Sequence, residues 1–152
     1  MDTSTQPSSA PKFTGKVCHK VEGNNRIFIP AGWRFDRAVT LYMIVKELKP
    51  CISVLTQAEY ERLEASAEAM EDEERSQFLD ALGSHTFEVK MDKGGRISIP
   101  EGLFEILGLP KARSLWLTGS VKSFNIWSVA NYEAHEAGEA ERAKDLKRKR
   151  GI

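Results

Sequence analysis

Two short segments of the chain carry an acidic residue followed four positions later by an arginine. Glu22 precedes Arg26, and Asp92 precedes Arg96, which lies 70 positions further along the chain. A carboxylate at the start of a turn can accept backbone N–H groups and pair with an arginine across the turn. The arginine is then held in one direction, where its planar set of donors can bind a phosphate or the O6/N7 edge of guanine. This spacing predicts recognition of a polyanion rather than catalysis.

Each acid–arginine pair lies inside a ten-residue segment that occurs twice. Residues 21–30 are VEGNNRIFIP and residues 91–100 are MDKGGRISIP, so both contain an acid, three turn-forming residues, an arginine, two alternating apolar residues and a proline. The alternation predicts a strand with Ile97 and Ile99 turned inward and Arg96 turned outward. We expect each segment to form a β-corner that presents its arginine to solvent. Such a corner can enter the major groove of DNA.

The corners are rich in glycine and have lysines beside them. Gly94 and Gly95 can supply the positive φ of a tight turn. Lys20, Lys90 and Lys93 add positive charge around the corners. An acid–arginine pair could also do no more than hold a hairpin together, because surface ion pairs are common and individually weak. The residues alone leave this structural interpretation open beside the one of recognition.

A second repeat follows the first, at an offset of 72 residues. Residues 52–61 (ISVLTQAEYE) correspond to residues 124–133 (FNIWSVANYE). Each copy therefore predicts a strand, a corner, a second strand, a connector, a β-hairpin and a helix. The expected hairpins pair 40–45 with 51–55 and 113–118 with 122–127.

Sequence signals mark where the helices begin and end. A capping box at Thr56 and Glu59 begins the first helix. Gly83 is expected to close a second helix, and Gly108 a short one in the second half. The last helix is expected to span 129–149.

The pattern predicts an α+β fold made of two small halves. We divide the chain into a disordered leader (1–12), a first repeat with a helical connector (13–83), a second repeat (84–141) and a basic tail (142–152). Each half has about four short strands and too little core to be stable alone. The halves must therefore pack on each other, exchange strands or oligomerise.

The formal net charge is zero, but the charge is unevenly distributed. Residues 57–84 hold nine acidic and two basic residues, whereas 12–49 hold eight basic and three acidic ones. Residues 142–150 hold six basic residues and one acidic residue. Attraction to a polyanion can therefore be local. The basic tail is either a grip on phosphates or a solubilising end without a partner.

Several other functions find no support in the residues. The chain has no phosphate-binding glycine motif, no local signature of a nucleophile and no metal-ligand spacing, so we expect no enzyme, cofactor or metal site. No apolar run approaches the ~18 residues of a membrane helix. The polar start lacks the features of a secretory signal. Cys18 and Cys51 are expected to be buried free thiols of a cytoplasmic protein.

The repeated corner also resembles a known family. The segment 91–100, followed by Leu107-Gly108-Leu109 and then by 124–127 (FNIW), is similar to MraZ, and the similarity extends over roughly 13–135. The resemblance implies two AbrB-like halves in a swapped-hairpin arrangement with pseudo-twofold symmetry. It implies a transcriptional regulator that binds short DNA repeats upstream of the division and cell wall gene cluster. It further implies a ring-shaped homo-oligomer that is associated with the nucleoid.

Carried over to this chain, the resemblance assigns DNA contact to Arg96 and Lys93, with Asp92 shaping the loop. Glu22 and Arg26 are the counterparts in the first copy. We add Lys16 and Lys20 as phosphate contacts, Lys90 as a further DNA-binding residue, and Gly94 and Gly95 as loop-shaping residues.

The first copy departs from the family pattern. Glu22 replaces the usual aspartate, and 23–25 (GNN) replaces a turn that normally carries a basic residue and glycine. Glycine and asparagine tolerate positive φ, so the turn is still expected. Glu22 is one methylene longer than aspartate, so we expect it to capture N–H groups more loosely.

Two alternatives remain beside the regulator. One is an antitoxin of the same fold, in which a DNA-binding half is joined to a segment that wraps a toxin. The other is a ring-forming interaction protein with no role on DNA.

Overall fold

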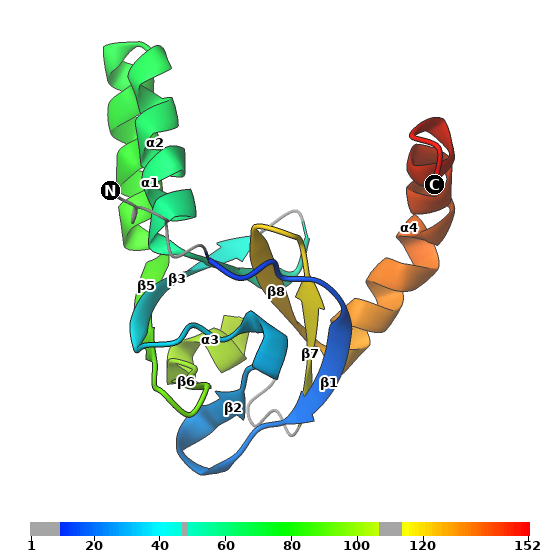
Figure 1. Ribbon diagram of the computed structural model, residues 1–152. Coiled ribbons are helices and arrows are strands. Elements are labelled where there is room, and N and C mark those ends of the chain that lie inside the picture. Colours follow the sequence, from blue (N-terminus) through cyan, green and yellow to red (C-terminus); the bar gives the residue numbers. More distant parts are fainter. Residues whose placement is uncertain (1–9, 47–48, 107–113) are drawn as a thin grey trace, which may run out of the picture.

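The computed structural model describes residues 10–46, 49–106 and 114–152 (Figure 1). The strands are β1 (Lys16–Lys20), β2 (Arg26–Phe28), β3 (Val39–Lys46), β4 (Cys51–Leu55), β5 (Thr86–Met91), β6 (Arg96–Ser98), β7 (Ser114–Gly119) and β8 (Ser123–Ser128). The α-helices are α1 (Gln57–Ala65), α2 (Asp72–Ser84), α3 (Glu101–Ile106) and α4 (Val129–Lys149). Short 3-10 turns occupy Gly23–Asn25, Ala31–Trp33 and Ser66–Ala69. The predicted α+β class and both predicted hairpins are confirmed.

Some predictions concern residues outside this part of the chain. They are most of the 1–12 leader, the similarity at Leu107-Gly108-Leu109, the helix stop at Gly108, and the start of the second hairpin at Arg113.

The strands of the two halves interleave. The larger sheet has the order β1-β7-β8-β4-β3-β5, and β2 pairs with β6 in a second, two-stranded sheet. All of these pairs are antiparallel. The first strand of each half thus pairs with the hairpin of the other half, as β1 with β7 and β5 with β3. In the sequence repeat, β1, β3 and β4 of the first half correspond to β5, β7 and β8 of the second. When each strand is replaced by its counterpart, the strand order is the same from either edge of the sheet. Neither half could form its sheet alone.

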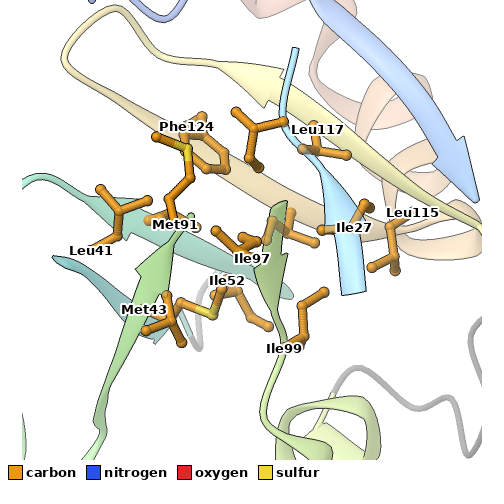
Figure 2. Packing of buried hydrophobic residues seen from close by; sticks show 14 of the residues in the cluster. Ile27, Leu41, Met43, Ile52, Met91, Ile97, Ile99, Leu115, Leu117 and Phe124 are labelled. Atoms are coloured by element: carbon orange, nitrogen blue, oxygen red, sulfur yellow. The ribbon is translucent and has the colours of Figure 1, made fainter. Parts of the chain in front are cut away.

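The main core lies between the six-stranded sheet and the β2–β6 pair (Figure 2). Ile27 and Ile97 lie opposite each other in this pair and are 0% and 1% exposed. Ile29 and Ile99 continue the same face, whereas Ser98 is exposed, as the alternation predicted. Side chains of the larger sheet complete the core, among them Leu41, Met43, Ile52, Met91, Leu115, Leu117 and Phe124. Burial of this apolar surface is the main force that holds the corners against the sheet.

Helix α1 begins at the predicted cap, but only half of the capping box forms. The Glu59 N–H donates to Thr56 Oγ1 at 3.2 Å. The Glu59 carboxylate pairs instead with Arg62 Nη2 at 2.6 Å. Helix α4 has the same kind of cap, since the Asn131 N–H donates to Ser128 Oγ at 3.0 Å. Its bounds agree with the predicted 129–149.

The predicted end of the second helix was wrong. Helix α2 continues through Gly83 to Ser84 and is capped at His85. Polar side chains replace the expected glycine cap: Ser84 Oγ donates to the Asp80 carbonyl at 2.8 Å, and Thr86 Oγ1 donates to the Leu82 carbonyl at 2.6 Å. These bonds satisfy carbonyls at the helix end, so a left-handed glycine is not required.

Two helical arms leave the sheet on opposite sides (Figure 1). One arm consists of α1 and α2, joined by an exposed acidic turn. Arg75 holds this turn by donating to the carbonyls of Ala67 and Met70 at 3.2 and 2.9 Å. The other arm is α4, whose basic end carries the residues assigned to a tail. Both β-corners lie at the other end of the molecule.

The two cysteines differ in environment. Cys51 is buried, and burial raises the pKa of its thiol to about 11. Cys18 is exposed, so the prediction that both thiols are buried was wrong. The reason is that β1 is an edge strand on which Lys16, Cys18 and Lys20 share the exposed face.

Candidate nucleic-acid interface

The backbone joins the two corners into one unit. At their bases, the Glu22 N–H donates to the Arg26 carbonyl at 2.7 Å, and the Asp92 N–H donates to the Arg96 carbonyl at 3.0 Å. Each corner also bonds to the strand that leaves the other corner. The Ile29 N–H donates to the Gly95 carbonyl at 2.7 Å.

The equivalent bond in the other direction runs from the Ile99 N–H to the Asn25 carbonyl at 2.8 Å. Donors and acceptors of the two bonds are related by the same 70-residue offset as the sequence repeat. In the pairing of β2 with β6, Arg26 lies opposite Ser98, and Phe28 lies opposite Arg96. The arginines therefore start from fixed and related positions on one two-stranded sheet.

In the second corner, Asp92 holds Arg96 by its backbone and its side chain. The Arg96 N–H donates to Asp92 Oδ1 at 3.0 Å, and Arg96 Nε donates to Oδ2 at 3.3 Å. The hydrogen bond from the Arg96 backbone lowers the pKa of Asp92, with further contributions from the Arg96 charge and the Gly94 N–H. The Arg96 side chain is 37% exposed. Within the described residues its terminal nitrogens have no protein partner, so two donor groups remain for a ligand.

Phe28 supports the same arginine from the neighbouring strand. Arg96 Cζ lies 5.8 Å from the centre of the Phe28 ring. An arginine over an aromatic face gains a weak electrostatic attraction and loses freedom of movement. The site residues inferred from sequence did not include Phe28. The sequence feature that could have revealed Phe28 is an aromatic residue at an outward position of the strand, between the inward Ile27 and Ile29.

A second arginine lies behind the corner, at Gly95. Gly95 has φ +82°, and a Cβ at this position would collide with the Arg34 side chain. Arg34 Nε donates to the Ile29 carbonyl at 2.8 Å. Arg34 thus holds Ile29, which directly follows the strand that leaves the first corner, next to the turn of the second corner. Sequence reasoning missed Arg34, because it lies outside both ten-residue segments and no spacing links it to Gly95.

The first corner follows the same backbone course, but it lacks the clamp of the second corner, in which the acid side chain holds the arginine by hydrogen bonds. Asn24 and Asn25 take the left-handed conformation, with φ 64° and 57°. The Glu22 side chain makes no capping hydrogen bond. Across residues 10–46, 49–106 and 114–152, no ion pair joins Glu22 to Arg26. Arg26 is half-buried but is not held as Arg96 is.

The lysines inferred from sequence are all exposed. Lys93 lies in the turn of the second corner, and Lys20 ends the strand that leads into the first. Lys90 lies on β5, next to the second corner. Because β1 and β5 are the two edges of the larger sheet, Lys20 and Lys90 approach the corner unit from opposite sides.

The described ranges hold no cluster of three or more side chains that could ligate a metal ion. No helix among these residues has the length and apolar character needed to cross a membrane.

The fold and the corner unit define a class of protein. It is an α+β protein in which two interleaved β-corners carry Arg26 and Arg96 on one two-stranded sheet.

Comparison with known proteins gives the family. The family model described as "MraZ protein, putative antitoxin-like" matches residues 82–151. A protein named transcriptional regulator MraZ from Leuconostoc citreum is 29% identical over 136 residues, 88% of this chain and 93% of that protein. The protein of the same name from Acetivibrio thermocellus is 27% identical, over 90% of this chain and 95% of its own length. The one from Syntrophobacter fumaroxidans is 26% identical, over 82% and 85%. The chain is similar to the MraZ family, and these matches support the resemblance seen in the sequence.

Proposed function

We propose that this protein is a DNA-binding transcriptional regulator without catalytic activity. The observation that carries the proposal is the corner unit, in which Arg26 and Arg96 lie on one pair of strands and the corners are hydrogen-bonded to each other. The names of the relatives, transcriptional regulators, point the same way.

In this proposal the two corners face one duplex. Lys20, Lys90 and Lys93 contact phosphates and set the register, and the arginines read base edges. The clamp by Asp92 and the stacking on Phe28 order Arg96 before DNA arrives. A side chain that is already ordered loses less entropy on binding, so Arg96 contributes more than Arg26.

We extend the proposal to the arrangement that the family resemblance implies. The interleaved strands suit two AbrB-like swapped-hairpin halves. A ring-shaped homo-oligomer would bring several corner units to several short DNA repeats, and linked weak contacts add up to strong binding. The sites would lie upstream of the division and cell wall gene cluster, and the protein would act in the cytoplasm, on the nucleoid.

Binding to the DNA upstream of the protein's own gene tests this function. Fluorescence anisotropy of a labelled upstream fragment should show binding that weakens steeply as salt rises, and a scrambled fragment should bind less tightly. Arg96→Ala should weaken specific binding by about 1–3 kcal/mol, which is roughly 5- to 150-fold.

Arg62→Ala is the matched control, because Arg62 is an exposed arginine on the α1–α2 arm that also pairs with a nearby carboxylate. The control should bind like the parent protein. Equal binding by the parent and Arg96→Ala would show that the corner is not the DNA site.

The antitoxin alternative is kept because the matching family model is described as antitoxin-like. An antitoxin would need a segment that wraps a toxin. Co-purification of a stable, toxic partner with the tagged protein would favour it. Binding to no DNA at any salt concentration would favour the interaction protein.

A further inference from the structure

A cavity separate from the corners lies on the outer side of the larger sheet, at the base of α4. Its volume is about 420 Å³, within the range of ligand sites. Its walls include Lys16 of β1, Asn125 and Trp127 of β8, and Tyr132 and His135 of α4.

Asn125 is the most informative residue of this wall. It is 8% exposed, and its Oδ1 has no hydrogen-bond partner within the described chain. Its neighbours across the sheet are Ser53 and Thr118, and neither hydroxyl donates a hydrogen bond to this oxygen. A buried amide without a partner is unfavourable, and such groups are rare unless a ligand or function requires them.

The fold does not require an amide at this position. Ser53 is the counterpart of Asn125 in the first half, and the two residues face each other across the centre of the sheet. Serine at the equivalent place is compatible with the same strand pairing. An amide adds one acceptor and two donors, a combination suited to the edge of a heterocyclic base.

The lining of the cavity also carries positive charge. Lys16 Nζ donates to the Tyr132 hydroxyl at 2.9 Å and lies 3.8 Å from Glu136 Oε1. The hydrogen bond to Tyr132 raises the pKa of Lys16, so the amino group is charged at neutral pH. Lys49 lines the cavity as a second cation, and among the described residues of the lining Glu136 is the single carboxylate. The cavity therefore favours an anion.

Aromatic contacts make this wall rigid. The Trp127 ring lies 4.6 Å from the His135 ring and 5.9 Å from the Tyr132 ring, measured between centroids. Trp127 is 2% exposed, so these contacts are part of a packed layer. A preformed wall of this kind loses little entropy when a ligand binds.

The equivalent groove of the first half lacks these features. It is lined by Ser53, Leu55 and Leu63 where the cavity has Asn125, Trp127 and His135. The combination of a buried amide with two lysines thus occurs at this cavity and not at the equivalent groove, which supplies a matched control.

We propose that this cavity binds a nucleoside monophosphate. The phosphate lies between Lys16 and Lys49, and the edge of the base bonds to the Asn125 amide. This site is independent of the proposed DNA contact by Arg96.

The test uses the full-length protein, the four nucleoside monophosphates AMP, GMP, CMP and UMP, and inorganic phosphate. The indole N–H signal of Trp127 in NMR spectra reports on the cavity, and calorimetry gives the affinity. At least one of the nucleotides should bind saturably below about 1 mM and shift the Trp127 signal. Lys16→Gln and Asn125→Ser should each weaken this binding by roughly tenfold or more. Lys46→Gln, in the groove of the first half, should leave it unchanged.

Asn125→Ser is expected to fold, since serine occupies the equivalent position 53, and thermal unfolding checks this. Three results would overturn the proposal. One is no saturable binding of any of the four nucleotides. Another is binding of inorganic phosphate as tight as that of the nucleotides and insensitive to Asn125→Ser. The last is binding that Arg96→Ala abolishes and Lys16→Gln does not, which would place the nucleotide at the corners.

Discussion

Asp92 accepts two hydrogen bonds from Arg96, at 3.0 Å from the backbone N–H and at 3.3 Å from Nε. One carboxylate thereby closes the turn and fixes the direction of the arginine. The counterpart Glu22 makes no capping hydrogen bond with its side chain. The two corners share a backbone course but differ in how firmly each arginine is held.

The titration of Asp92 should report on this clamp. Its pKa lies below the usual value of about 3.9, mainly because of the Arg96 backbone N–H. A carboxyl group with a lowered pKa in the folded state stabilises the protein above its unfolded pKa. That contribution is lost as the pH falls through the folded pKa, so the clamp is complete above about pH 4 and opens in more acidic solution.

NMR titration of the Asp92 carboxyl carbon measures the pKa. Arg96→Ala should move it only part of the way back, because alanine keeps the backbone N–H. A pKa that is unshifted in the parent protein, or identical in the variant, would show that the clamp does not form in solution.

The difference between the corners should appear in the motion of the arginines. Nitrogen relaxation of the Nε–H groups should give a higher order parameter for Arg96 than for Arg26, because the structure holds only Arg96 by a carboxylate and an aromatic ring. Asp92→Ala should lower the Arg96 value toward that of Arg26, whereas Glu22→Ala should leave Arg26 as it was. Equal order in the parent protein would contradict the asymmetry.

Gly95 is the glycine whose replacement should disturb the corner unit most. Gly95→Ala combines a left-handed φ of +82° with a collision against Arg34, whose hydrogen bond to Ile29 would be disturbed. We expect a loss of about 2 kcal/mol or more in the free energy of unfolding. Gly23→Ala is the control, since a Cβ there meets nothing within 4 Å, and it should change stability by less than about 0.5 kcal/mol. Urea unfolding of both variants measures the two changes in the free energy of unfolding. Similar losses of stability in Gly95→Ala and Gly23→Ala would show that the collision with Arg34 does not occur.

Much of this arrangement could be predicted from the sequence, because repeats and alternation are local signals. The 70-residue offset located both corners, and the alternation around Ile97 gave the inward face of β6 correctly. The two hairpins followed from turn residues, and the start of α4 followed from the repeat at an offset of 72 residues. These features depend on residues that are close together in the chain.

The features that were missed depend on residues that are far apart. Arg34 approaches Gly95 only after β2 and β6 pair, and nothing within either segment announces the contact. The exposure of Cys18 depends on β1 being an edge strand, which follows from the sheet order. The end of α2 was wrong because Ser84, His85 and Thr86 satisfy the carbonyls that a glycine cap was expected to satisfy.

Val121 offers a stabilising substitution. It has φ +70° and its side chain is 52% exposed, so a β-branched residue sits in a strained conformation with little burial to compensate. Its backbone exchanges two hydrogen bonds with Phe13, at 2.8 and 2.9 Å, which hold the conformation in place. Val121→Asn should raise the free energy of unfolding by about 1 kcal/mol, because asparagine tolerates the left-handed region. Val121→Ile, which keeps the β-branch, should bring no gain in the same urea experiment, and a loss in Val121→Asn would show that the turn is not strained.

The basic end of α4 should act on DNA without regard to sequence. Residues 142–152 are exposed, and the ion pairs that they make within the described part of the chain are confined to α4, as between Arg148 and Asp145 at 3.1 Å. Deleting 142–152 should therefore leave thermal unfolding nearly unchanged. If the proposed function holds, the deletion weakens binding to specific and scrambled DNA alike and lowers the salt slope by about 0.9 for each phosphate that the shortened protein no longer neutralises. A variant with glutamine at 144, 147 and 148 keeps the helix and should show part of the same weakening. A deletion that erased the preference for the upstream fragment while the salt slope stayed constant would place sequence reading in α4 and not in the corners.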